Sequence, residues 1–311
     1  MLIEEVVVVR FLLSLFLLLP AWAGESGKTV IFGHGAYGTV PTFDQGYLLF
    51  TQQMGGPGFE VFGPDGLLRF FTSVENPHGA RVTSVAADSD GSVAAGFAFL
   101  GQQGISGGIA YFDSSGKQTQ FVDTGKYTPA HVCFDRSHSL WTFGWQRDPS
   151  TDYDETRDYM MFRKYSDGKE MGRYGPRSIM PARGLNPGAP SLGLWRLRVA
   201  DDRIGAIADS GATSENPVWI ELGLDGHVIG TWPMGRDLRG GLAFTSSGRL
   251  CRQTPAGKAK LSGIECLDRN SGSWKHAGDA PVQGLLLGAD GDELVFSRGD
   301  GVITLHWAKI P

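Results

Sequence analysis

One pattern recurs six times along this chain of 311 residues: an apolar run, a short turn and a second apolar run. Successive turns are roughly 45 residues apart, except for one longer interval. The six copies are VPTFDQGYLLF, SVAADSDGSVAAGF, VCFDRSHSLWTFGW, LRVADDRIGAIA, LAFTSSGRLCR and LLLGADGDELVFS. Repetition at a period of this length is typical of proteins built from stacked or radially arranged units. The repeat therefore limits the fold more strongly than any single motif does.

A second hairpin pattern follows each of the first five copies. These segments are FEVFGPDGLLRFF, IAYFDSSGKQTQF, MMFRKYSDGKEMGRY, VWIELGLDGHVIGTW and IECLDRNSGSWKH. Four short strands per repeat, with turn signals throughout and no sustained helical period, are typical of one blade of a β-propeller. The sequence predicts an all-β fold: residues 24–311 form a single six-bladed β-propeller domain whose blades are four-stranded antiparallel sheets.

The sixth repeat provides one strand fewer than the others, because only VITLHWAKI follows its first hairpin. The segment TVIFGHG, residues 29–35, precedes the first repeat and has no partner of its own. We therefore predict that this N-terminal strand becomes the outer strand of the last blade and closes the ring. The pairing would also cover a sheet edge that is otherwise open to aggregation.

The stretch DSDGS, residues 88–92, allows two interpretations. A calcium-binding loop of the helix-loop-helix kind needs its glycine at the sixth position, whereas here the glycine is the fourth residue. Asp-Gly also provides the positive φ angles that a hairpin turn requires, and the dipeptide occurs six times in the chain. The motif therefore predicts a turn between two strands.

This layout of strand, Asp-Gly turn and strand resembles the six-bladed propellers of the TolB-like and NHL-like kind. The resemblance covers residues 24–311 and implies the fold. Because the shared feature is turn chemistry, it implies no particular activity.

The first 23 residues are typical of a secretory signal peptide. Arg10 precedes an apolar run over residues 11–19, and Ala21-Trp22-Ala23 forms an A-x-A cleavage site. The run is too short to cross a bilayer, which needs about 20 residues. We predict cleavage after Ala23, secretion or export to the periplasm, and a mature chain without a stable membrane span.

The chain has three cysteines, Cys133, Cys251 and Cys266. Export makes a bond between Cys251 and Cys266 possible, and the spacing alone leaves that question open. Cys133 lies in an apolar strand pattern, which predicts a buried free thiol.

The net charge of −5 and the scattered basic residues argue against nucleic-acid binding. The partner that we predict is an anionic small molecule or a protein, bound by a monomeric chain.

The long connections indicate where a ligand would bind. In a four-stranded antiparallel meander the tight hairpin turns lie on one face of the propeller, and the other connections lie on the opposite face. Long loops are uncommon unless they bind something or are disordered. The long connections all belong to the second face, and they begin after Phe99, Trp145, Gly175, Asp209 and Thr254.

The entries to the inner strands surround the channel mouth on this long-loop face. The predicted ligand-binding residues are Arg81, His131, Trp145, Arg196, Arg239 and Gln283. Guanidinium groups bind carboxylate and phosphate with a two-pronged fork, which favours an anionic ligand. The alternative is that the arginines only satisfy main-chain carbonyls or pair with acids such as Asp209 and Asp237.

A binding or interaction module is the function that the sequence favours. The alternative is a metal-dependent hydrolase of the lactonase or esterase kind, with its site at the same mouth. The histidines show neither H-x-H nor HExxH spacing. The acidic loop 148–158 could surround a cation, but a solvated hairpin tip is the interpretation that we favour. We predict no catalytic residue, no metal and no cofactor.

Overall fold

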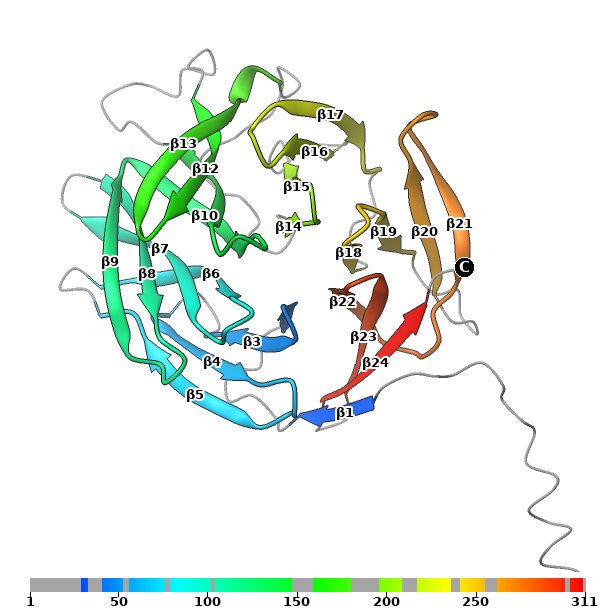
Figure 1. Ribbon diagram of the computed structural model, residues 1–311, viewed down its shortest axis with the longest axis horizontal. Coiled ribbons are helices and arrows are strands. Elements are labelled where there is room, and N and C mark those ends of the chain that lie inside the picture. Colours follow the sequence, from blue (N-terminus) through cyan, green and yellow to red (C-terminus); the bar gives the residue numbers. More distant parts are fainter. Residues whose placement is uncertain are drawn as a thin grey trace, which may run out of the picture.

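The protein is described here by a computed structural model with six four-stranded antiparallel sheets (Figure 1). The described residues are 29–32, 41–52, 56–75, 79–101, 104–146, 159–179, 196–208, 217–235, 241–254, 262–299 and 303–309. The first three sheets contain β2 (Thr42–Asp44), β3 (Tyr47–Thr51), β4 (Gly58–Phe62) and β5 (Leu68–Ser73); β6 (Arg81–Ala87), β7 (Val93–Gly101), β8 (Gly104–Phe112) and β9 (Gln118–Gly125); and β10 (Tyr127–Phe134), β11 (Leu140–Gln146), β12 (Met160–Ser166) and β13 (Lys169–Pro176).

The last three sheets complete the circle. They contain β14 (Arg196–Val199), β15 (Arg203–Ala208), β16 (Val218–Gly223) and β17 (Val228–Pro233); β18 (Leu242–Phe244), β19 (Leu250–Gln253), β20 (Gly263–Asp268) and β21 (Ser273–Asp279); and β22 (Leu285–Asp290), β23 (Glu293–Gly299), β24 (Ile303–Lys309) and β1 (Thr29–Phe32). In the described part of the chain the one helical element is a 3-10 turn at Arg177–Ile179.

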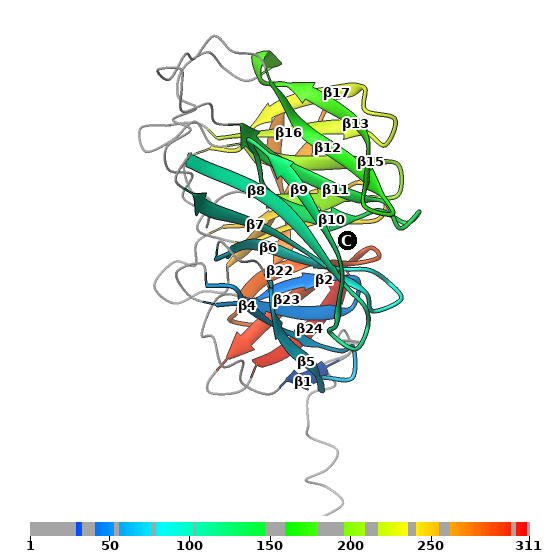
Figure 2. The ribbon, with the colours of Figure 1, turned by 90° about the vertical axis from the view of Figure 1, so that its left-hand side faces the viewer.

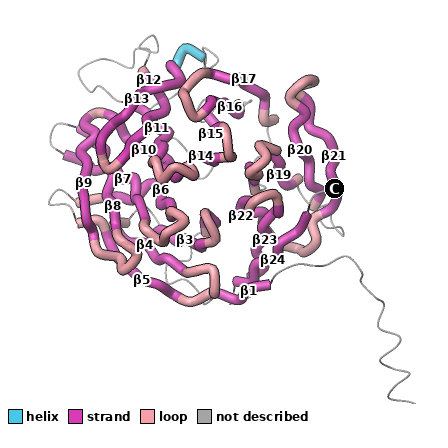
Figure 3. Tube along the Cα trace, in the orientation of Figure 1, coloured by secondary structure: helices cyan, strands magenta, loops and turns pink. Residues whose placement is uncertain are grey.

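The sheets are arranged as the blades of a six-bladed β-propeller. Within the first five blades the strands follow one another in sequence, and the first strand of each blade lies nearest the centre (Figures 1 and 3). The fold class predicted from the repeat is therefore confirmed.

Local turn chemistry explains the hairpins. At residues 88–92, between β6 and β7, the Asp88 amide donates to the Ser92 carbonyl oxygen at 2.8 Å, and the Gly91 amide donates to the Asp88 carbonyl oxygen at 3.0 Å. Gly91 has a φ of 87°, which glycine adopts without a steric cost. The same pair of hydrogen bonds closes the turns 113–117 and 135–139. The DSDGS motif is a hairpin turn, as predicted, and such turns gather along one side of the propeller (Figure 2).

Packing between blades forms the core. Six clusters of buried apolar side chains are present, and each contains residues from two neighbouring blades. Successive residues of one strand enter different clusters: Trp219 packs toward the fifth blade, whereas Ile220 packs toward the third. Because both faces of each blade are covered in this way, β16 is buried at every position.

The sixth blade is assembled from both ends of the described chain. Its strand order is β22, β23, β24 and β1, and β1 is antiparallel to β24, with Val30 opposite Leu305. Val30 also packs against the cluster between the sixth and first blades, where the rings of Phe43 and Trp307 meet edge to face. We expect this pairing of β1 to hold the ring closed.

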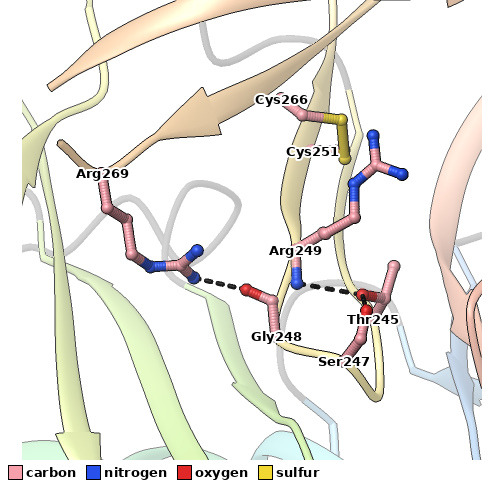
Figure 4. Close-up of a disulfide and its surroundings, with 7 residues drawn as sticks. All are labelled: Thr245, Ser247, Gly248, Arg249, Cys251, Cys266 and Arg269. Atoms are coloured by element: carbon pink, nitrogen blue, oxygen red, sulfur yellow. Dashed lines mark hydrogen bonds between the residues drawn. A yellow bond between two sulfur atoms is a disulfide. The ribbon is translucent and has the colours of Figure 1, made fainter. Parts of the chain in front are cut away.

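A disulfide links Cys251 on β19 to Cys266 on β20 (Figure 4). The two residues are directly opposite each other in the ladder, with their Cα atoms 4.0 Å apart. The neighbouring hairpin turn is closed by the Arg249 amide, which donates to Thr245 Oγ1 at 3.0 Å. Cys133 is a buried free thiol, as predicted.

Candidate functional site

A cavity of about 470 Å³ occupies the centre of the ring. Its walls come chiefly from the inner strands, and all six blades contribute. It extends from Pro41 and Gly241, which precede two inner strands, to Ser246 and Gly291 in hairpin turns. Its length therefore covers most of the central channel. A volume of this size is within the range of small-molecule sites, roughly 300–1,000 Å³.

Arg198 brings a positive charge into this cavity. It lies on β14 between Leu197 and Val199, which also line the cavity. Its Nη1 donates to the Leu197 carbonyl oxygen and its Nη2 donates to the Leu287 carbonyl oxygen, both at 3.1 Å. Its Nε is buried and has no acceptor, and no ion pair joins it to a carboxylate of the described residues. The guanidinium is thus positioned by neutral groups and its charge is not compensated by contact.

Asp44 is a cavity acid whose charge acts on Arg198. It is the last residue of β2 and accepts a hydrogen bond from the Ala87 amide at 3.2 Å. Burial raises the pKa of Asp44 to about 7, although the charge of Arg198 and the Ala87 amide act in the opposite direction. Burial also lowers the pKa of Arg198, which Asp44 partly offsets. The two side chains therefore influence each other across the channel, from blades on opposite sides of the ring.

Two other polar groups of the wall have partners within the protein. Thr83 Oγ1 donates to the Pro129 carbonyl oxygen at 2.5 Å, and Asp290 accepts a hydrogen bond from Trp307 Nε1 at 2.9 Å. Cys133 is buried, and burial raises the pKa of its thiol well above the usual value. It is therefore a neutral thiol at physiological pH and not an activated nucleophile.

The predicted site residues fall in different places. His131 lines the cavity. Arg81 begins β6 and Gln283 precedes β22, and both are exposed outside the cavity wall. Trp145 is only 7% exposed and packs in the cluster between the third and fourth blades. Arg196 begins β14, but its side chain is outside the described part, as are Arg239 and the acidic loop 148–158.

Sequence reasoning missed Arg198 and Asp44. It placed the site at the first residue of each inner strand, whereas these two side chains lie farther along the strands. The signal for Arg198 was a charged residue between two apolar residues of an innermost strand. Asp44 gave no separate signal, because an acid immediately before a hairpin turn is explained by the turn.

One hydrolase-like motif has a structural explanation. Residues 104–108 read GISGG, which fits the G-x-S-x-G pattern of a nucleophile elbow. An elbow requires a sharp turn from a strand into a helix, whereas Ser106 lies within β8 opposite Phe99 of β7. The motif is part of a regular strand here.

The described residues lack two features. They contain no group of three or more His, Cys, Asp or Glu side chains placed to hold a metal ion. No helix among them is long and apolar enough to cross a membrane.

Solved structures share the propeller architecture with this chain. A gluconolactonase from Xanthomonas campestris is 13% identical, with a TM-score of 0.47 over 91% of this chain and 86% of its own. The Pan2 WD40 domain of Neurospora crassa is 11% identical, with a TM-score of 0.49 over 86% and 74%. No family model and no curated sequence matches the chain. The class that fold and site define is a six-bladed β-propeller with a polar central cavity.

Proposed function

We propose that this protein is a binding module that holds a small anionic ligand in the central cavity of its propeller. The observation that carries the proposal is Arg198, a partly buried arginine whose Nε is buried without an acceptor and whose described partners are neutral main-chain carbonyls. A cavity charge that has no counter-charge in contact with it is costly. An anion in the cavity would form the direct ion pair that Asp44 does not form, and its binding would recover part of that cost.

The proposal also gives a role to residues at the mouth of the channel. Arg81, Arg196 and Arg239 are candidates for attracting an anion at the long-loop face, because charges at the mouth of a cleft raise the local concentration of an oppositely charged ligand. Gln283 is neutral and would donate a hydrogen bond from its side-chain amide. Arg198 would then hold the ligand within the cavity.

A thermal-shift and calorimetry screen tests this function. The probes are lactate, benzoate, inorganic phosphate and an acidic sugar, each compared with CaCl2 and ZnCl2. A ligand at about 100 times its Kd adds roughly 2.7 kcal/mol of stability, which should raise Tm by several degrees. We expect a shift with at least one anion, and we expect Arg198→Gln to abolish it while Arg198→Lys retains part of it.

Arg81→Gln is the matched control, because it removes the same charge outside the cavity wall. A shift lost in Arg81→Gln and kept in Arg198→Gln would move the site to the entrance. No shift with any anion would contradict a small-anion site and direct the search to a protein partner.

The metal-dependent hydrolase stays the alternative, and the cation arm of the same screen tests it. A shift with Ca²⁺ or Zn²⁺, followed by turnover of a lactone or ester, would establish it.

We also propose that the chain is exported and cleaved after Ala23. The Cys251–Cys266 disulfide supports an oxidising compartment. Protein recovered from the periplasm of a Gram-negative host should begin at Gly24 and show one titratable thiol when denatured without reduction. An uncleaved cytosolic chain with three thiols would contradict export.

A further inference from the structure

We propose that anion binding in the central cavity is coupled to the uptake of one proton by Asp44. This inference rests on the proposed function and adds a regulatory property to the same site. It follows from the placement of Asp44 and Arg198 in a single cavity, with no ion pair formed between them.

The charge of the cavity depends on the protonation of Asp44. When Asp44 is ionised, its charge balances that of Arg198, so an entering anion meets a wall of zero net charge from this pair. When Asp44 is neutral, the pair carries one positive charge, and the protonated carboxyl can donate a hydrogen bond to the ligand. An anion therefore binds more tightly to the protonated form, and by linkage its binding draws a proton from solvent onto Asp44.

The surroundings of Asp44 favour this behaviour. Tyr47 of β3 is opposite Asp44 in the first hairpin, Asp88 follows β6, and Asp290 ends β22. Both of these neighbouring acids have other donors, since Asp88 is 2.9 Å from His138 Nδ1 and Asp290 accepts from Trp307. The strand β10 contributes His131 and Cys133 to the same cavity. Asp44 receives one main-chain amide among its described contacts, and no described side chain donates a hydrogen bond to it.

The pKa of Asp44 sets the pH window. With a value of about 7 in the free protein, the acid is mostly neutral at pH 6 and mostly ionised at pH 8. If the anion binds only the neutral form, Kd should be about tenfold weaker at pH 8 than at pH 6. The ligand must be ionised throughout, which lactate and benzoate are.

Calorimetry in buffers of different ionisation enthalpy measures the coupling. For the anion found in the screen, we expect uptake of nearly one proton per ligand at pH 8 and little uptake at pH 6. Asp44→Asn should bind at pH 8 as tightly as the unmodified protein binds at pH 6, without proton uptake. His131→Gln is the control for the histidine of the wall and should leave the pH dependence unchanged.

Each result decides between the two proposals. Equal affinity at pH 6 and pH 8, or a pH dependence lost in His131→Gln, would overturn the coupling and leave the anion site intact. Failure of every anion to bind at pH 5.5, where the cavity is most positive, would overturn both proposals.

The melting temperature of the ligand-free protein also tests the protonation of Asp44. The folded protein keeps a proton that the unfolded chain releases near pH 4, so Tm should fall as the pH rises from about 4 to about 7. Asp44→Asn should remove that part of the decline.

Discussion

Replacing Glu221 by alanine is expected to lower the free energy of unfolding by about 2–4 kcal/mol, because it leaves the buried Trp219 Nε1 without an acceptor and the partly buried Arg269 without its counter-charge. Glu221 lies on β16 and is fully buried. Its carboxylate accepts hydrogen bonds from Arg269 Nε at 2.9 Å, from Arg269 Nη2 at 2.6 Å and from Trp219 Nε1 at 2.7 Å. Since Arg269 follows β20, the contact joins the fourth blade to the fifth.

A matched control is available in the fifth blade. Glu265 accepts from Arg252 Nε at 3.0 Å and from Nη2 at 2.7 Å, so the bond geometry is similar, but its carboxylate is 27% exposed whereas that of Glu221 is fully buried. We expect Glu265→Ala to cost about 1 kcal/mol or less. Urea denaturation of both variants measures the difference. Equal losses of unfolding free energy in the two variants would show that burial of the carboxylate does not determine how much each ion pair stabilises the fold.

Deleting β1 is expected to cost roughly 2–4 kcal/mol and to lower Tm by several degrees. Each hydrogen bond of a ladder contributes about 1 kcal/mol net, and β1 is paired with β24 over Thr29–Phe32. The deletion also uncovers the outer edge of β24 and part of the cluster that contains Phe43 and Trp307. Aggregation should increase, because an exposed strand edge can pair with another chain.

Truncation in two steps tests this closure of the ring. A variant that begins at Thr29 is compared with one that begins at Gly33, and both are compared with a chain that begins at Gly24. We expect the first to match the full mature chain and the second to melt earlier. Identical melting curves for the two truncations would show that β1 does not hold the ring closed.

The fold was predictable from the sequence because its information is local and repeated. Asp-Gly turns such as Asp90-Gly91 mark hairpins wherever they occur, and the unequal first and last repeats predicted the partner of β1. The residues of the candidate site were harder to predict from the sequence. Whether Arg198 faces the cavity or a neighbouring blade depends on the packing of distant strands, and the raised pKa of Asp44 comes from burial that six blades produce together. For Trp145, too, the sequence suggested a place near the predicted mouth and did not reveal that the side chain packs in the core.

The alternation of side chains between two neighbouring blades also limits how such a chain can diverge. Inserting one residue within β16 would exchange the partners of Trp219 and Ile220 and disturb two interfaces at once. Changes of length are therefore tolerated in the connections and not in the strands. An insertion in a loop would leave the interfaces between blades unchanged, because the strand residues would keep their alternation between neighbouring blades.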